Sequence, residues 1–242
     1  MPRDTTTPTR RWPWVVGLVA AGLAMALLIT QALRGGGRPP APPPAAFPAP
    51  PAPRFAGPEA GAHQAFTPEQ ARAAEERLLD EQAFTHPVDA AAPDVTVTGV
   101  DGKPIRLSTL RGQVLFVNFW ATWCPPCLQE MPSMLQLGQA LAKAHPGRFK
   151  MVAVSGDDGW EAVHAYFKQT FGGVPKELLL ARDDGAKAAQ GYYCTARGYC
   201  PDVKFPETYI VDRSGKVLAM IVGPRDWADP GFRQWLEFVI AG

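Results

Sequence analysis

The sequence predicts an α/β protein in which helices flank a mixed central sheet and a transmembrane helix precedes the folded domain. The run 114–120 is almost continuously apolar, as expected of a strand that is covered on both faces of a sheet. After it, segments with helical periodicity alternate with short apolar runs, and 209–221 is typical of a closing hairpin. Near the N-terminus, the stretch 12–33 carries no charged side chain.

The N-terminus is expected to anchor the chain in a membrane. Residues 1–11 are polar and end in adjacent Arg residues. Residues 12–33 are long enough to cross roughly 30 Å of hydrocarbon as one helix, with Trp12 and Trp14 where an interfacial aromatic belt would lie. We therefore assign 1–11 to a cytoplasmic tail and 12–33 to a transmembrane anchor. A cleaved signal peptide and a twin-arginine export signal are alternatives, and under each of them the rest of the chain lies outside the cytoplasm.

A linker and a lead-in helix are expected between the anchor and the folded domain. Residues 34–66 are rich in Pro, Ala and Gly and favour extended polyproline II, so they form a semi-rigid spacer, with or without a tuned length. Thr67 followed by Pro is typical of a helix start, and a helix is expected from there to about Phe84. We assign 67–92 to this helix and a connection, and 93–242 to the folded domain.

Within the folded domain, the expected elements follow the pattern of apolar residues. Strands at 95–100 and 105–107 form a hairpin around the Asp101-Gly102 turn. The buried strand 114–120 leads into a helix at about 128–141, which Pro132 should kink. Further strands are expected at 149–154, 178–180, 209–211 and 217–221, and further helices at 160–171, 184–192 and 229–240.

Composition and charge exclude several classes of function. Lys and Arg number 24 against 23 Asp and Glu, so a net charge of +1 indicates neither a nucleic-acid-binding surface nor strong attraction of acidic substrates. The 4 Cys residues are too few for a disulfide-dense small domain. No Ser/His/Asp grouping and no phosphate-binding loop stands out. The chemistry must therefore come from a more local feature.

That feature is the stretch Trp123-Cys124-Pro125-Pro126-Cys127, directly after the apolar strand. Pro is favoured in the first turn of a helix, so a helix can begin there. A thiol at a helix N-terminus lies beside unsatisfied N–H groups and the positive end of the helix dipole, and both favour the thiolate. Cys124 is therefore a candidate nucleophile. A C-x-x-C motif alone is not specific, because zinc sites use it as well.

Four stretches together carry a resemblance to a known family. They are the strand and motif at 117–127, Glu-Met-Pro at 130–132, Phe-Pro-Glu-Thr-Tyr-Ile-Val-Asp at 205–212 and the segment 92–112. They resemble the TlpA/ResA-like branch of membrane-anchored thioredoxin-fold thiol-disulfide oxidoreductases, which includes the thioredoxins of cytochrome c maturation. The resemblance covers about 93–242. It implies a thioredoxin-like fold with an N-terminal β-hairpin extension.

The resemblance also implies roles for the residues of the motif. Cys124 attacks a disulfide as a thiolate and forms a mixed disulfide, which Cys127 then resolves. Glu130 lies about one helical turn beyond Cys127, where a partly buried carboxylate would titrate high and could exchange protons with the sulfurs. The alternative is an exposed glutamate that is merely favoured near a helix N-terminus.

A substrate-binding edge is expected beside the dithiol. By the resemblance, Pro206 is cis and its loop lies next to Cys124, where a substrate backbone can pair. Phe205 and Glu207 would then contact the substrate. Trp123 is expected to form a recognition surface, or alternatively to pack on the sheet. The expected substrate-binding residues are Trp123, Pro125, Pro126, Phe205, Pro206 and Glu207.

Cys194 and Cys200 depart from the pattern of the family. They lie in what resembles an insertion before the cis-proline loop, and the simplest interpretation is a structural disulfide that closes this loop outside the cytoplasm. A second redox pair that exchanges electrons with Cys124 and Cys127 is an alternative. A metal site with all four cysteines is a weaker one, because the spacing does not suit a zinc module.

The leading functional interpretation is a membrane-tethered thiol-disulfide oxidoreductase that uses no cofactor and reduces disulfides in specific partner proteins. Its expected partners are disulfide-containing extracytoplasmic proteins and a membrane electron donor, with no nucleic acid. The expected location is the bacterial inner membrane, single-pass, with the catalytic domain in the periplasm or otherwise outside the cytoplasm. A copper-handling protein that binds metal through the same cysteines is an alternative. Peroxidase-like use of Cys124 is a third.

Overall fold

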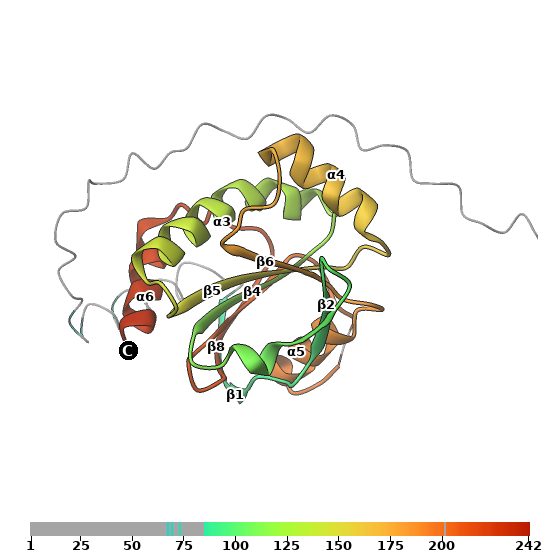
Figure 1. Ribbon diagram of the computed structural model, residues 1–242. Coiled ribbons are helices and arrows are strands. Elements are labelled where there is room, and N and C mark those ends of the chain that lie inside the picture. Colours follow the sequence, from blue (N-terminus) through green and yellow to red (C-terminus); the bar gives the residue numbers. More distant parts are fainter. Residues whose placement is uncertain (1–66, 68, 70–72, 74–84, 201) are drawn as a thin grey trace, which may run out of the picture. The chain divides into compact units, whose positions relative to one another are not determined.

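The computed structural model describes residues 67, 69, 73, 85–200 and 202–242. Within this part of the chain, the strands form one eight-stranded sheet in the order β1-β8-β7-β4-β5-β6-β2-β3. Helices lie on both faces of this sheet, as Figure 1 shows. The expectation of an α/β fold with a mixed central sheet flanked by helices is confirmed.

The middle of the sheet is parallel and its two flanks are antiparallel. Strands β4, β5 and β6 run parallel, β7, β8 and β1 extend the sheet on one side, and β2 and β3 extend it on the other. The predicted N-terminal hairpin is the β2–β3 pair. The strands are β1 Thr85–Ala91, β2 Thr96–Gly99, β3 Pro104–Arg106, β4 Val114–Trp120, β5 Phe149–Ser155, β6 Leu178–Arg182, β7 Glu207–Val211 and β8 Lys216–Val222.

The sheet separates two hydrophobic cores, one on each of its faces. Helices α3, α4 and α6 pack on one face, whereas α5 and the short 3-10 helix η1 pack on the other (Figure 1). The helices are α3 Pro125–Ala144, α4 Trp160–Phe171, α5 Lys187–Arg197, α6 Pro230–Ala241 and η1 Leu107–Leu110.

Strand β4 positions the active site. All of its residues are buried. Phe116 and Trp120 belong to the core under α3, whereas Val117 and Phe119 belong to the core on the opposite face, as the two-residue period of a strand requires. The chain leaves β4 at Trp120 and enters α3 at Pro125. The two cysteines therefore lie just beyond the carboxyl end of a central, fully buried strand.

Two elements differ from the sequence prediction. Strand β1, Thr85–Ala91, pairs with β8 at the edge of the sheet, although we expected 67–92 to be a helix and a connection. The sheet therefore begins before residue 93. Helix α5 continues to Arg197 instead of ending near Tyr192, because Tyr193 extends its buried face and Gly198 supplies the left-handed C-cap.

Several N-terminal predictions concern residues outside the described ones. The expected tail at 1–11, anchor at 12–33 and linker at 34–66 lie there. Of the expected lead-in helix, the structure describes Thr67, Glu69 and Ala73, and the last two are helical. No helix among the described residues combines the length and the apolar character that a membrane crossing needs.

Candidate active site

The dithiol pair forms the first turn of α3. Cys124 is the N-cap residue of this helix and is joined to Cys127 by a disulfide, with 5.3 Å between their Cα atoms. The backbone N–H of Cys127 donates to the Cys124 sulfur over 3.3 Å. Cys124 is 5% exposed and Cys127 is fully buried. The helix N-terminus thus stabilises negative charge on the more accessible sulfur, as the predicted order of attack requires.

The loop before β7 lies beside this pair. The Phe205–Pro206 peptide bond is cis, which confirms the prediction for Pro206. The Phe205 ring packs against Trp123 with 5.7 Å between ring centroids. Trp123 is 64% exposed, so it does not serve as a core residue of the sheet. Pro125 is exposed and Pro126 is half-buried beside it. Pro206 itself is buried, so the expectation that it contacts the substrate directly is wrong, and Trp123, Phe205, Pro125 and Pro126 form a partly apolar surface next to Cys124.

Glu130 lies under the dithiol and is 2% exposed. Its Oε1 accepts a hydrogen bond from Asn118 Nδ2 over 2.9 Å, and its Oε2 accepts from the Arg225 backbone N–H and from Trp227 Nε1, each over 3.0 Å. Burial raises the pKa of Glu130 to about 7, although the three donors and the nearby Arg225 charge oppose this shift. The buried position that we expected for this carboxyl is confirmed, and the exposed alternative is wrong.

Asn118 and Thr208 allow this carboxyl to hold or release a proton. Asn118 Nδ2 also donates to Thr208 Oγ1 over 2.9 Å, while Asn118 Oδ1 is buried without a hydrogen-bond partner. If the amide rotated, this oxygen would face Glu130. It could then accept a hydrogen bond from the protonated carboxyl. The Thr208 hydroxyl can donate or accept, so it suits either orientation. The site therefore accommodates both protonation states of Glu130.

Asp157 fixes the loop that enters the cysteine motif. Its carboxylate accepts hydrogen bonds from the Thr122 backbone N–H over 2.9 Å, from Thr122 Oγ1 over 2.5 Å and from Ser155 Oγ over 2.6 Å. Ser155 ends β5, the parallel neighbour of β4. Asp157 therefore ties the residue before Trp123 to the rigid sheet.

The structure corrects the prediction for Glu207. This residue is 1% exposed and therefore cannot contact a substrate directly, because it opens β7 with its side chain turned into the core under α5. Its Oε2 accepts a hydrogen bond from Tyr209 Oη over 2.7 Å. Burial raises the pKa of Glu207 to about 7. It is a second buried acid, on the face of the sheet opposite to Glu130.

Cys194 and Cys200 form a second disulfide, as the sequence predicted. Cys194 lies within the last turn of α5 rather than in a loop, and Cys200 is exposed just beyond the helix. The four cysteines therefore form two separate pairs, which does not fit a single four-cysteine metal site. Among the described residues, no group of three or more His, Cys, Asp and Glu side chains could hold a metal ion.

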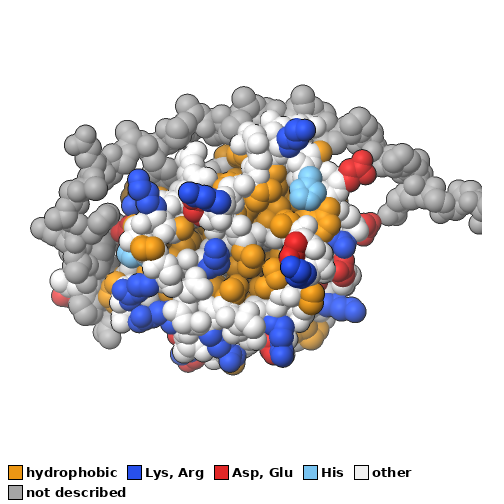
Figure 2. Space-filling model, viewed as in Figure 1, with side chains coloured by type: hydrophobic (Ala, Val, Ile, Leu, Met, Phe, Trp, Pro, Cys, Tyr) orange, Lys and Arg blue, Asp and Glu red, His pale blue; other side chains and the backbone are white. Residues whose placement is uncertain are grey.

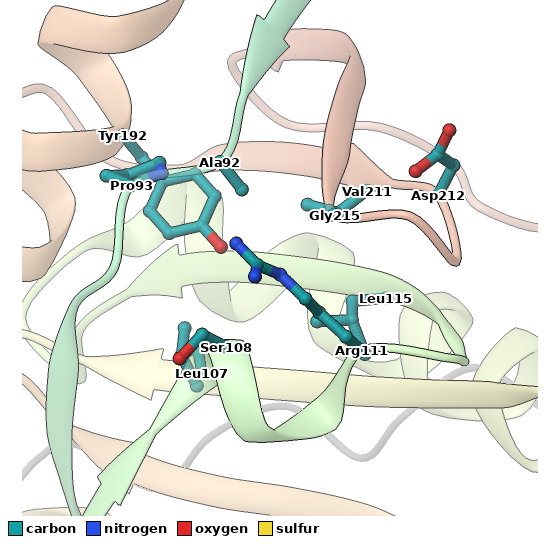
Figure 3. A pocket seen from close by; sticks show the side chains of 10 residues that line it. All are labelled: Ala92, Pro93, Leu107, Ser108, Arg111, Leu115, Tyr192, Val211, Asp212 and Gly215. Carbon is teal, nitrogen blue, oxygen red and sulfur yellow. The ribbon is translucent and has the colours of Figure 1, made fainter.

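The pocket shown in Figure 3 lies away from the cysteines. Leu115 and Val211 line it, and they pair at the end of the sheet where β4 begins. Arg111 extends across it towards the Tyr192 hydroxyl (Figure 3). Its volume of about 10 Å³ suffices for about one water molecule. This pocket is therefore no substrate site.

On the face shown in Figure 2, described Lys and Arg side chains are scattered between hydrophobic and acidic ones rather than joined in one stripe. Nucleic-acid-binding proteins usually gather such charges on one face. The chemistry that stands out is that of the dithiol at the N-terminus of α3.

Several site residues were missed by the sequence reasoning. Asn118 and Thr208 are polar residues inside buried strands, and that contrast was a usable signal. Asp157, Arg225 and Trp227 carry no comparable signal, because their contacts depend on how distant loops fold back on the motif.

A helix-capping dithiol, a buried acid beneath it and a cis-proline loop beside it define a thioredoxin-fold thiol-disulfide oxidoreductase. The chain belongs to the AhpC/TSA family, which matches residues 88–220, and within the thioredoxin fold to the ResA/TlpA-like thiol-disulfide oxidoreductases.

Similar proteins carry the same activity in their names. The thiol-disulfide oxidoreductase ResA of Bacillus cereus is 34% identical over 132 residues, which are 54% of this chain and 68% of that protein. ResA of Geobacillus thermodenitrificans is 30% identical over 152 residues, which are 63% of this chain and 78% of that protein. A crystal structure from Chlorobium tepidum, assigned as the thiol:disulfide interchange protein DsbE, is 31% identical with a TM-score of 0.52. The match covers 63% of this chain and 97% of the Chlorobium tepidum chain.

Proposed function

We propose that this thiol-disulfide oxidoreductase works as a reductant of specific partner proteins, tethered to a membrane with its catalytic domain outside the cytoplasm. The observation that carries the exchange chemistry is the buried acid beneath the dithiol, and the reducing direction is proposed from the family resemblance. A carboxyl with a pKa of about 7 can supply and accept protons near neutral pH, as disulfide exchange requires in either direction.

The proposed reaction proceeds in two exchange steps. The Cys124 thiolate attacks one sulfur of the partner disulfide, forms a mixed disulfide and releases the other partner sulfur as a thiolate. The Cys127 sulfur then attacks Cys124, which frees the partner's second sulfur and leaves the Cys124–Cys127 disulfide. Two electrons pass from the dithiol to the partner. A separate electron donor must then reduce the dithiol, and we propose a donor in the membrane.

Glu130 is proposed to manage the protons of these steps. Cys127 is fully buried and its thiol must lose a proton before it can attack. Glu130 lies one helical turn away in the same core, and its carboxylate can take this proton. The Asn118 amide and the Thr208 hydroxyl then adapt to the neutral acid.

The partner is proposed to bind on the surface formed by Trp123 and Phe205, beside the buried Pro206. An exposed aromatic ring that packs on a second ring beside the nucleophile offers apolar contact area. Such a surface favours a partly apolar peptide segment that contains the disulfide.

The location is proposed from the sequence. The uncharged stretch 12–33 supports a single-pass anchor in a bacterial inner membrane, and the Pro-rich stretch 34–66 supports a spacer that lets the domain reach its partners. The second disulfide at Cys194 and Cys200 also suits an oxidising compartment outside the cytoplasm.

Trapping tests the proposal. In Cys127→Ser, the mixed disulfide on Cys124 cannot be resolved, so partner proteins should accumulate on the reduced full chain, where mass spectrometry identifies them. Cys124→Ser should trap nothing and should lose disulfide exchange. Exchange that survives Cys124→Ser would contradict the assigned nucleophile.

The direction of electron flow needs its own measurement. The partners trapped in cells should be recovered as disulfides when the full chain is deleted and as thiols when it is present. If deletion instead leaves their cysteines reduced, the protein is an oxidant and the proposed direction is wrong.

A further inference from the structure

The loop between β5 and α4, residues 156–159, supports one aromatic residue of the proposed partner-binding surface directly. Phe205 packs on Gly156 so closely that a Cβ atom added to Gly156 would lie 2.5 Å from Cε2 of the ring. The Gly156 backbone N–H donates to the carbonyl oxygen of Trp120 at the end of β4, over 2.8 Å. The Phe205 ring therefore rests on loop backbone that is hydrogen-bonded to the strand before the cysteine motif.

The same β5–α4 loop also holds the other aromatic residue, Trp123. The Asp157 carboxylate accepts hydrogen bonds from both the backbone N–H and the hydroxyl of Thr122, the residue before Trp123. The two rings lie 5.7 Å apart between centroids. One loop thus supports both partners of this aromatic contact, and a shift of the loop would change how they meet.

Arg182 fixes the β5–α4 loop from the neighbouring strand. It ends β6 and is the register partner of Ser155, which ends β5. Its Nη1 donates to the carbonyl oxygen of Asp158 over 2.6 Å, and more weakly to that of Asp157 over 3.4 Å. Its Nη2 forms an ion pair with Asp184 over 2.6 Å. Hydrogen bonds from a charged donor are stronger than neutral ones, so the guanidinium is a firm hold on this loop.

The guanidinium of Arg182 is itself held in place. The Arg182 side chain is only 17% exposed, although it carries a charge. Its ion-pair partner Asp184 accepts a further hydrogen bond from the Thr98 hydroxyl on β2 over 2.8 Å. Arg182 therefore bridges the loop and a second point on the sheet. The planar fork of donors makes this possible, and neither an apolar side chain nor the single ammonium of Lys reproduces it fully.

We propose that Arg182 is a positioning residue for partner recognition, which holds the β5–α4 loop so that Trp123 and Phe205 stay packed together beside Cys124. Arg182 acts through the loop, by way of Asp157 on one side and Gly156 on the other. The link to partner binding rests on the proposed function, whereas the effect of Arg182 on the packing of the two rings does not.

NMR of the oxidised full chain tests the effect on the rings. In Arg182→Met, the nuclear Overhauser contacts between the Trp123 indole and the Phe205 ring should weaken, because the loop loses its charged donor. Arg182→Lys should restore part of their intensity, since it keeps a charged donor but not the fork. Contacts of unchanged intensity in Arg182→Met would overturn the proposal.

Arg148→Met is the matched control. Arg148 also donates to a backbone carbonyl, that of Ala241, over 2.8 Å. It precedes Phe149 at the opposite end of β5, away from the cysteine motif. The contacts between the two aromatic rings should persist in this variant. An equal loss in Arg148→Met and Arg182→Met would overturn the proposal, because the loss of any arginine clamp would then suffice.

Two synthetic peptides test the link to partner recognition. Each contains one intramolecular disulfide, flanked by Leu in one peptide and by Ser in the other. The ratio of their kcat/KM values with the reduced full chain reports apolar recognition, and a general loss of active protein cancels in this ratio. The wild type should prefer the Leu-flanked peptide by about tenfold, as an added hydrophobic contact allows. Arg182→Met should lose most of this preference, and Arg148→Met should keep it.

The outcomes separate this inference from the proposed function. A wild type without any preference would show that the proposed binding surface is wrong, while the NMR contacts still decide the role of Arg182. A preference that survives Arg182→Met would overturn the link from Arg182 to the partner. If Arg182→Met does not fold, Asp184→Asn removes the charge that pairs with Arg182 at an exposed position. It should weaken the ring contacts and the preference in the same direction, and no change in either would contradict the proposal.

Discussion

The indole nitrogen of Trp227 lies 3.0 Å from Oε2 of Glu130, although 97 positions separate the two residues in the chain. Trp227 belongs to the connection between β8 and α6, and its ring packs against Phe116 and Phe232, each at 4.8 Å between centroids. The C-terminal part of the domain therefore delivers a hydrogen-bond donor to the acid under the dithiol. This contact favours the charged form of Glu130 and limits the rise of its pKa.

Trp227→Phe should raise the pKa of Glu130 further, because the indole donor is lost while burial is kept. Carbon NMR of labelled glutamate would measure this shift. Phe232→Leu is the matched control, since it disturbs the same aromatic cluster and leaves the hydrogen bond in place. Both variants should lower the free energy of unfolding. If Phe232→Leu moved the pKa as much as Trp227→Phe, packing rather than the donor would set it.

Glu130→Gln should change how stability depends on pH. The pKa of Glu130 in the folded state, about 7, lies above the ordinary glutamate value of 4.5 that applies in the unfolded chain. The stabilisation that Glu130 contributes to the free energy of unfolding is therefore fully present below pH 4.5 and is lost as the pH rises through 7. The shift corresponds to a loss on the order of 3 kcal/mol. The variant lacks this titrating group and should not show this loss. The free energy of unfolding of Glu130→Gln minus that of the wild type should therefore increase by about this amount between pH 4.5 and pH 8.

Chemical denaturation at a series of pH values would measure this difference. Glu207 titrates in the same range in both proteins, so its contribution cancels. Parallel stability curves for the two proteins would show that Glu130 has a normal pKa in the folded state.

Much of the fold could be predicted because burial on both faces leaves a plain signal. The continuous apolar run at β4 predicts a strand covered on both faces, and the helical spacing in α3, α4 and α6 predicts helices with one buried face. Strand β1 was missed because Pro87 and Asp89 interrupt its pattern. An edge strand tolerates both residues, and its register shifts between Pro87 and Ala90.

Spacing predicted the site only where it is local in sequence, whereas the cis-proline at Pro206 was predicted by the resemblance. Cys124, Cys127 and Glu130 share two turns of one helix, so spacing alone brings them together. Glu207 was misplaced because a shift of one residue along a strand exchanges the surface for the core. Trp227 could not be predicted, because its contact with Glu130 depends on the packing of β8 and α6.

Thr122→Val should loosen the loop that enters the motif. The substitution keeps the shape of the side chain and removes the hydroxyl that donates to Asp157 over 2.5 Å. We expect the free energy of unfolding to fall by about 1–3 kcal/mol, the usual effect of leaving a buried acceptor with fewer donors. Thr109→Val is the control, because Thr109 makes its hydrogen bond at an exposed site. Equal losses of unfolding free energy in the two variants would show that the buried hydrogen bond to Asp157 stabilises the fold no more than the exposed one does.

Gly156→Ala should separate partner binding from dithiol chemistry. A Cβ atom at Gly156 would lie 2.5 Å from Cε2 and 2.8 Å from Cζ of Phe205, so the ring must shift and its contact with Trp123 must change. We expect kcat/KM for a trapped partner protein to fall about tenfold, which corresponds to about 1.4 kcal/mol of lost transition-state binding. Exchange with a small linear disulfide such as oxidised glutathione should remain, because it does not use the aromatic surface. Gly159→Ala is the control, since its added Cβ meets no atom within 4 Å. A Gly156→Ala variant that slowed both reactions equally would place the defect in the dithiol and contradict a recognition role for Phe205.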